Sequence, residues 1–287
     1  MENIKVGFIG LGVMGTPMCE NIVKSGYEVF AYDVSEKALA YAESFGVKAL
    51  KNAEEVVKAA DVTITMLPNG DIVKSVLQSV ESAFTSEKTY IDMSTINFSS
   101  VEEIVKRLKN RGVAVLDAPV VKSKAAAISG DLGILVGGEK ADYERVLPLL
   151  KRMGKNTIYM GKNGSGYLAK VCHNMLVGEI SVAVSETLTL AKTLGLDVED
   201  FVTAVSYGGG QNFYMDRKAK AIVKEDYSCN FALGYEYKDL NLAKELEEKS
   251  GLDLSGLENA LKKYEEGVKD GYSSDDFCKI IKTIKTK

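Results

Sequence analysis

Two hydrophobic patterns alternate along the first half of the chain. Short runs rich in valine and isoleucine are separated by longer stretches in which apolar residues recur every three or four positions. The short runs predict strands at Ile4–Ile9, Glu28–Tyr32, Val62–Leu67, Thr89–Met93 and Val113–Leu116. Intervening stretches, such as Glu54–Ala60 and Val101–Arg111, predict helices. This alternation predicts an α/β domain of Rossmann type with a doubly wound parallel sheet.

The pattern changes close to Gly161. Two further expected strands, Leu132–Val136 and Thr157–Met160, precede this point. From Gly166 to Leu194, small and apolar residues follow one another without a proline, which predicts a single long helix. The remainder has an almost entirely helical pattern. We therefore expect two domains, residues 1–162 and an all-α domain at residues 163–287 joined to the first by the long helix.

Composition excludes several classes of protein. The 287 residues carry a net charge of -4, so nothing in the overall charge attracts nucleic acid, and none is expected as a partner. The four cysteines are far apart and form no CxxC pair, so we expect neither a metal site nor disulfides. Lys5 and several glycines interrupt the apolar N-terminus, and no run is long enough to cross a bilayer. We expect a cytoplasmic protein with no membrane partner.

A glycine-rich motif follows the first expected strand. It matches GxGxxG and consists of Gly10, Leu11, Gly12, Val13, Met14 and Gly15. The first glycine permits a tight turn, the second lets the backbone approach a pyrophosphate, and the third lets helix and strand pack closely. The N-terminus of the following helix favours a phosphate group. The motif alone is a weak signal, but between a strand and a helix it predicts dinucleotide binding.

Asp33 ends the second expected strand, 23 positions after Gly10. A carboxylate there can accept the adenine-ribose hydroxyls and would repel the extra phosphate of NADP, which favours NAD. Lys37 keeps NADP possible because a nearby cation could accommodate that phosphate, and Asp33 could instead only cap a helix. Other strand ends fall where ligands bind in such sheets, at Met66, Leu67, Pro68, Ser94 and Thr95.

Hydride transfer to a carbonyl also requires a proton carrier. Lys170 and Asn174 lie four residues apart on the expected long helix and therefore share a face, with His173, the only histidine in the sequence, at its edge. An uncharged lysine can act as a base and a charged one as an acid. His173 could serve the same face or be structural.

Several spaced motifs resemble one family. GFIGLGVMGTPM, MLPN, DMST, DAPV, GSGYLAKVCHN and YKDLNLA recur in order over nearly the whole chain. Together they resemble the β-hydroxyacid dehydrogenases, which include 3-hydroxyisobutyrate dehydrogenase, tartronate semialdehyde reductase and the succinic semialdehyde/glyoxylate reductases. The resemblance implies a homodimer or homotetramer in which Lys170 is the general acid/base and Asn174 orients the substrate. It also implies that Phe231, Lys238 and Asp239 lie at the nicotinamide end of the cofactor.

The substrate loop departs from that family. Members usually read DAPVSGG, where the Ser-Gly-Gly segment binds the substrate carboxylate, whereas DAPV here is followed by Val121, Lys122 and Ser123. A side-chain cation could replace a backbone anion site, as in the similar sulfolactaldehyde reductases, or Lys122 could be an exposed loop lysine. His173 also departs, and the resulting His-Asn pair is similar to 6-phosphogluconate dehydrogenase, where it binds the sugar acid.

These observations favour an NAD(P)-dependent oxidoreductase. We expect it to reduce a small anionic semialdehyde, carboxylated or sulfonated, to the hydroxyacid, and to run in reverse as a 3-hydroxyacid dehydrogenase. A decarboxylating sugar-acid dehydrogenase, supported by His173 and Asn174, stays open. Imine reduction is disfavoured by Lys170, which imine reductases usually lack. A protein that binds NAD without catalysis would not require Lys170, Asn174, Lys238 and Asp239 together.

Overall fold

The computed structural model describes residues 4–285, which form two compact units that meet between Lys170 and Val171, inside the long helix. The first unit contains a nine-stranded sheet within the described range. Its strands are β1 (Lys5–Ile9), β2 (Glu28–Tyr32), β3 (Lys48–Ala49), β4 (Val62–Thr65), β5 (Thr89–Asp92), β6 (Ala114–Asp117), β7 (Val120–Val121), β8 (Gly133–Gly137) and β9 (Asn156–Gly161). The predicted Rossmann-type domain is confirmed.

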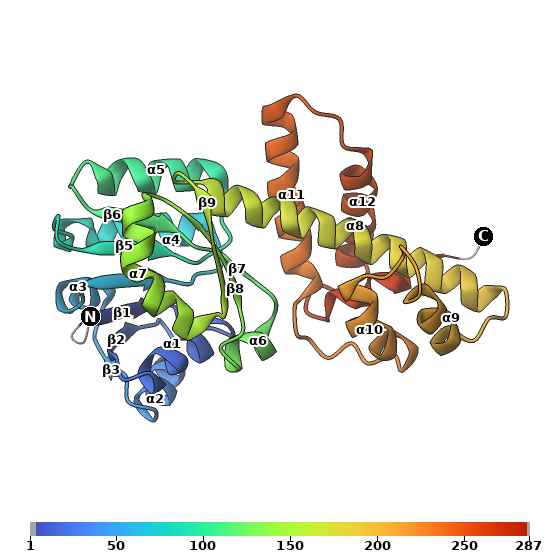
Figure 1. Ribbon diagram of the computed structural model, residues 1–287, viewed down its shortest axis with the longest axis horizontal. Helices are drawn as coiled ribbons and strands as arrows, with labels where there is room; N and C mark the ends of the chain where they lie inside the picture. Colours follow the sequence, from blue (N-terminus) through green and yellow to red (C-terminus); the bar gives the residue numbers. More distant parts are fainter. Residues whose placement is uncertain (1–3, 286–287) are drawn as a thin grey trace. The chain divides into compact units, whose positions relative to one another are not determined.

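Helices cover both faces of this sheet (Figure 1). The helices that contact one another along one face are α1 (Gly15–Lys24), α2 (Glu36–Glu43), α6 (Lys124–Ile128) and α7 (Lys140–Met153). Those that contact one another along the other face are α3 (Ala53–Ala59), α4 (Gly70–Val80) and α5 (Phe98–Lys109). Because both faces are covered, β4 and β5 are buried at every position, as expected for central parallel strands.

The sheet is parallel over its first part and mixed at its end. The order is β3-β2-β1-β4-β5-β6-β8-β7, with β9 on β8, and every pairing from β3 to β6 is parallel. β8 runs antiparallel to both β6 and β7, a reversal that the alternating pattern did not predict. The strands β3 and β7 were also missed, because two residues are too few to show a hydrophobic period.

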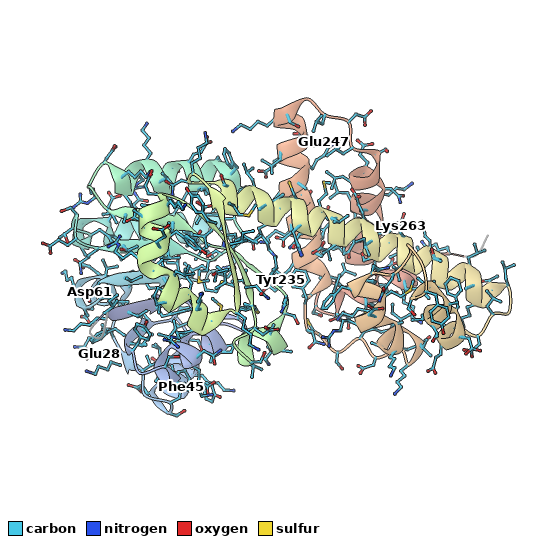
Figure 2. All side chains as sticks on the ribbon, viewed as in Figure 1. Glu28, Phe45, Asp61, Tyr235, Glu247 and Lys263 are labelled. Carbon is cyan, nitrogen blue, oxygen red and sulfur yellow. The ribbon has the colours of Figure 1, made fainter. Side chains whose placement is uncertain are left out.

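The second unit is helical, as predicted, and includes most of the long helix α8 (Ser165–Thr193). It contains α9 (Val198–Val205), α10 (Phe213–Val223), α11 (Leu233–Ser250) and α12 (Ser255–Lys269), and the 3₁₀ segment η2 (Phe277–Thr283). A 3₁₀ turn, η1 (Glu81–Ala83), lies in the first unit. Helices α11 and α12 lie side by side, with Tyr235 and Glu247 near the two ends of α11 (Figure 2). Gly251 ends α11 in the left-handed conformation that glycine favours.

The hydropathy of the helices bears on membrane insertion. Within residues 4–285, none of the helices has both the length and the apolar character needed to cross a membrane.

Candidate active site

The glycine motif forms the turn between β1 and α1. Gly10 has a φ of 100°, and a Cβ on it would lie 2.3 Å from the carbonyl oxygen of Met66. A Cβ on Gly15 would lie 2.0 Å from the carbonyl oxygen of Gly10. Neither position can hold a side chain without moving backbone atoms, so these two glycines permit the turn and the close packing of α1 on β1.

Gly12 has a different role. It is exposed, and a Cβ built on it meets nothing within 4 Å, so the space above the turn is open to a ligand. The adjacent N-terminus of α1 receives no side-chain cap from Met14, its N-cap residue. A pyrophosphate could therefore approach the backbone at Gly12 and accept hydrogen bonds from the helix N-terminus, with Val13 exposed beside it. The residues present thus fit a dinucleotide.

Asp33 closes the turn from the end of β2. Its Oδ2 accepts a hydrogen bond from the Leu11 N–H at 2.6 Å, and its Oδ1 accepts one from the Ser35 N–H at 2.8 Å. The side chain of Ser35, and not Asp33, caps α2. Asp33 is half-buried beside the glycine motif and does not itself cap α2, and its contact with the adenine ribose stays a prediction.

The ends of β4 and β5 are tied to each other and to β1. The Met66 N–H donates to the carbonyl of Ile9 at 3.0 Å, and the Leu67 N–H donates to Ser94 Oγ at 2.9 Å. Pro68 is exposed just beyond, and Thr95 follows Ser94 and is half-buried. The predicted cofactor residues of the first unit therefore lie along one edge of the sheet, at the carboxyl ends of neighbouring strands.

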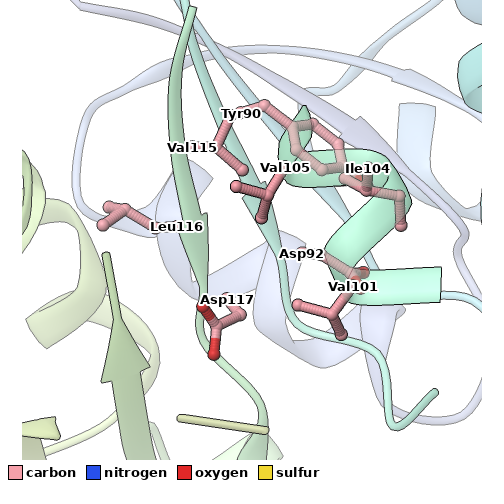
Figure 3. A pocket seen from close by; sticks show the side chains of 8 residues that line it. All are labelled: Tyr90, Asp92, Val101, Ile104, Val105, Val115, Leu116 and Asp117. Carbon is pink, nitrogen blue, oxygen red and sulfur yellow. The ribbon is translucent and has the colours of Figure 1, made fainter. Parts of the chain in front are cut away.

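Two buried carboxyl groups end the next pair of strands (Figure 3). Asp92 on β5 and Asp117 on β6 are register partners and are 6% and 4% exposed. Burial raises the pKa of Asp92 to about 6, although Ser94 and Thr65 donate hydrogen bonds to its carboxylate. Burial also raises the pKa of Asp117. A small cavity lies between this pair and Val101 of α5.

Asp117 fixes the start of α8. Its Oδ1 accepts a hydrogen bond from the Gly164 N–H at 2.7 Å, and its Oδ2 accepts one from the Tyr167 N–H at 3.0 Å. A Cβ on Gly166 would lie 2.3 Å from the carbonyl oxygen of Leu135 on β8. The GSGY segment thus lets the first turn of α8 pack directly on strand backbone. It places Lys170, one turn further on, at a set position relative to the sheet.

Lys170 is buried, with 7% of its surface exposed. Asn174, one turn along α8 on the same face, is 3% exposed, and its Nδ2 donates a hydrogen bond to the Asp239 carboxylate of α11. Because the amide nitrogen faces Asp239, its oxygen faces Nδ1 of His173 at 2.9 Å. An amide oxygen can only accept, so His173 donates through Nδ1 and helps to orient Asn174.

The three predicted residues beyond α8 lie in or just before α11. The Lys238 ammonium lies 3.0 Å from Asp239 Oδ1, so Asp239 binds both Lys238 and Asn174. The Phe231 ring packs edge-on against Phe277. The Phe231 carbonyl accepts a hydrogen bond from the Phe277 N–H at 2.9 Å, so η2 holds this segment in place.

The loop after β7 holds the three predicted substrate residues. Val121 pairs with Gly133 of β8, where a Cβ would lie 2.5 Å from Val121 Cγ2. The Lys122 ammonium does not lie free in the loop, because it contacts Asp131 Oδ2 at 2.6 Å and the Asp131 carbonyl oxygen at 2.8 Å. Ser123 precedes α6 without capping it through its side chain. A substrate anion would therefore compete with Asp131 for the lysine charge.

Sequence reasoning missed three acidic residues that shape this region. Asp92 and Asp117 stood inside quoted motifs, but no pattern showed that one would hold α8. Their position at the ends of buried apolar strands was the available signal. Asp131 lies nine positions from Lys122, across α6, and the sequence contained no sign of that pairing.

Known proteins with similar sequences match nearly the whole chain. Residues 5–161 match a family described as the NAD binding domain of 6-phosphogluconate dehydrogenase. Residues 164–284 match one described as the NAD-binding part of NADP-dependent 3-hydroxyisobutyrate dehydrogenase. The chain is 33% identical to 2-(hydroxymethyl)glutarate dehydrogenase of Eubacterium barkeri, over 98% of this chain and 95% of that one. It is 31% identical to a chloroplastic glyoxylate/succinic semialdehyde reductase of Arabidopsis thaliana, over 99% and 80%.

Solved structures agree with these matches. The 3-hydroxyisobutyrate dehydrogenase of Mycobacterium tuberculosis, determined with L-serine, superposes with a TM-score of 0.93 at 29% identity, covering 99% of this chain and 100% of the other. The predicted family, enzyme class and nicotinamide cofactor are thereby confirmed. The chain belongs to the β-hydroxyacid dehydrogenase family of NAD(P)-dependent oxidoreductases that act on CH–OH groups.

Proposed function

We propose that this protein uses NAD in preference to NADP to reduce a small semialdehyde bearing a carboxylate or sulfonate, and that it oxidises the hydroxyacid in reverse. Relatives named for hydroxymethylglutarate, succinic semialdehyde and L-serine support a short anionic substrate. The observation that carries the proposal is the buried Lys170 on α8, one turn from an Asn174 whose amide is fixed by Asp239.

Lys170 is the general acid/base of this proposal. A bound nicotinamide supplies or accepts the hydride. The Lys170 ammonium gives a proton to the carbonyl oxygen as the alkoxide forms, and the neutral amine takes the hydroxyl proton in the reverse direction. Its 7% exposure limits access of water to the amine. Asp117 supports the role from a distance, because it holds the Gly164 and Tyr167 N–H groups one turn before Lys170.

Asn174 orients the substrate in this proposal. Its amide nitrogen is committed to Asp239 and its oxygen faces the Nδ1–H of His173, so the amide plane is held from both sides. A fixed amide gives the substrate hydroxyl a hydrogen-bonding partner of defined direction. His173 acts on Asn174 and not as the proton carrier.

Preference for NAD follows from Asp33. Its carboxylate lies against the glycine turn, bonded to the Leu11 N–H at 2.6 Å. An additional phosphate on the adenine ribose would meet this negative charge. Lys238 and Phe231 are proposed to contact the nicotinamide end, and the loop formed by Val121, Lys122 and Ser123 is proposed to surround the substrate anion. A homodimer or homotetramer stays a prediction.

The test measures NADH oxidation with five aldehydes: succinic semialdehyde, sulfolactaldehyde, tartronate semialdehyde, methylmalonate semialdehyde and glyoxylate. The best substrate is then assayed with Lys170→Ala, which we expect to lower kcat by about 100-fold or more while NADH affinity changes less than about twofold. Lys192→Ala is the matched control, because Lys192 lies exposed on the same helix. Full turnover in Lys170→Ala would contradict the proposed proton carrier.

A second candidate is a decarboxylating sugar-acid dehydrogenase, favoured by the His173–Asn174 hydrogen bond. It predicts release of carbon dioxide during oxidation of a sugar acid such as 6-phosphogluconate. Measuring carbon dioxide alongside NADH formation separates the two, since the semialdehyde reaction releases none.

A further inference from the structure

The backbone at Lys122 has an unusual conformation for its residue type. Its φ is 77°, in the left-handed region that glycine adopts readily and that a long side chain rarely adopts. Among residues 4–285, Glu225 is the other non-glycine residue with positive φ. Lys122 stands in the middle of the substrate loop, directly after β7 and before Ser123. Something in the surrounding structure must hold it there.

Asp131 holds the Lys122 side chain at two points. The ammonium lies 2.6 Å from Asp131 Oδ2 and 2.8 Å from the Asp131 carbonyl oxygen. Asp131 itself is fixed, because its N–H donates to the Ala126 carbonyl of α6 at 2.8 Å. The Lys122 ammonium also lowers the pKa of Asp131, so the carboxylate is charged at neutral pH. The two side chains are 32% and 35% exposed, so the pair is screened in part by water.

The pair closes the base of a loop. Val121 of β7 is the register partner of Gly133 of β8, and the two strands are antiparallel. Lys122 and Asp131 lie just beyond this last strand pair, on the two sides of the segment that contains α6. An ion pair at this position joins the two ends of the segment, and it does so through Lys122, the non-glycine residue of the segment with a left-handed backbone.

We propose that Asp131 is a positioning residue which holds the Lys122 ammonium and thereby keeps the Val121–Ser123 loop in the conformation that binds the substrate anion. In this role the lysine charge is used to fix the loop and not to bind the substrate directly. Backbone N–H groups of the loop and the Ser123 hydroxyl then contact the anion. This inference rests on the proposed function of the loop.

The test is a double-mutant cycle on Lys122→Gly and Asp131→Ala, with KM, kcat and Tm measured for all four proteins. We expect Asp131→Ala alone to raise KM for the anionic aldehyde about tenfold, with kcat within about twofold, and to lower Tm. In the Lys122→Gly background, adding Asp131→Ala should change KM by less than about twofold and leave Tm unchanged. Glycine holds the left-handed conformation without the pair.

A matched control distinguishes loss of the Lys122–Asp131 contact from loss of any ion pair at Asp131. Lys155 lies 3.7 Å from Asp131 Oδ1 but belongs to another segment, so Lys155→Ala should leave KM and Tm as in the wild type. Equal effects of Asp131→Ala in both backgrounds overturn the proposal, as does the absence of any effect. A lower KM in Asp131→Ala also overturns it, because a freed ammonium would then be binding the anion. If wild type reduces none of the aldehydes, the proposed function fails, while the Tm cycle still tests the pairing.

Discussion

Two regions at the ligand-binding edge of the same sheet are built in opposite ways. In the turn after β1, three positions have no side chain: Gly10 and Gly15 leave no room for a Cβ, and Gly12 leaves the space open. At the ends of β5 and β6, charged side chains are buried: Asp92 and Asp117 are both less than 10% exposed. The glycines leave backbone at this edge open to a ligand. Asp117 instead uses its buried carboxylate to hold the first turn of a helix.

The two regions are constrained by different kinds of contact. The glycine turn is a motif of six consecutive residues, and it needs only that no Cβ stands where the carbonyl oxygens of Met66 and Gly10 lie. The buried carboxylates and the Lys122 pair depend on particular partner groups that other segments supply. Asp117 accepts hydrogen bonds from the N–H groups of residues 164 and 167, and Lys122, in a conformation that glycine adopts readily, contacts Asp131.

The largest expected effect comes from Gly10→Ala, which tests the glycine side of the comparison. The positive φ and the 2.3 Å approach of a Cβ to the Met66 carbonyl should destabilise the fold by at least about 3 kcal/mol, and NADH binding should be lost. Gly12→Ala is the control. Its Cβ meets no atom, so Tm should hold while the NADH dissociation constant rises at least about tenfold. Urea unfolding and fluorescence titration measure both.

An equal loss of Tm in both variants would show that the turn has a single structural role. Gly10 and Gly12 would then not have separate roles, one in folding and the other in cofactor binding.

The second largest effect is the dependence of the unfolding free energy on pH that arises from Asp92. Burial raises the pKa of Asp92 from 3.8 to about 6, so the folded state binds a proton between about pH 4 and 6 that the unfolded state releases. The unfolding free energy therefore falls as pH rises through this window, by up to about 3 kcal/mol from this group. Asp92→Asn should remove that slope. Unfolding free energies of wild type and variant are measured with urea at half-unit pH steps. Their difference isolates the contribution of Asp92 from that of carboxylates such as Asp276, whose lowered pKa gives the opposite dependence of stability on pH.

Parallel curves for wild type and Asp92→Asn would show that Asp92 titrates as an ordinary carboxylate. Its burial would then have no electrostatic consequence, and the contrast with the glycine turn would be one of packing alone.

The smallest effect concerns the acid on the glycine side. Asp33→Ala should weaken NADH binding and reduce the preference for NADH over NADPH by about tenfold, or about 1.4 kcal/mol. Asp33→Asn serves as the control because it keeps an oxygen for the Leu11 N–H and removes the charge. If the preference changes in both variants, the charge is responsible. An unchanged ratio of dissociation constants in both would refute the assignment of Asp33.

Much of the fold was predictable because its signals are periodic or local. The strands from β1 to β6 followed from apolar runs, apart from β3, and α8 followed from an unbroken apolar pattern. The reversed β8 was not predictable, since a strand's sequence carries little information on its direction relative to neighbours. Of the candidate site, the GxGxxG turn, Asp33 and the Lys170–Asn174 face were proposed from their spacing. The links from Asn174 to Asp239 and from Lys122 to Asp131 were not.

Local sequence patterns were sufficient to predict most strands, the long helix and the glycine-rich turn, and to propose Lys170 as the proton carrier, because backbone sterics and side-chain periodicity act over a few positions. The tertiary structure decided which charges meet. Asp117 reaches the start of α8, and Asp131 reaches Lys122, only after strand pairing has brought β6, β7 and β8 together. Hydrogen bonds between strands set that register, and the meeting of these charged groups with their partners follows from it.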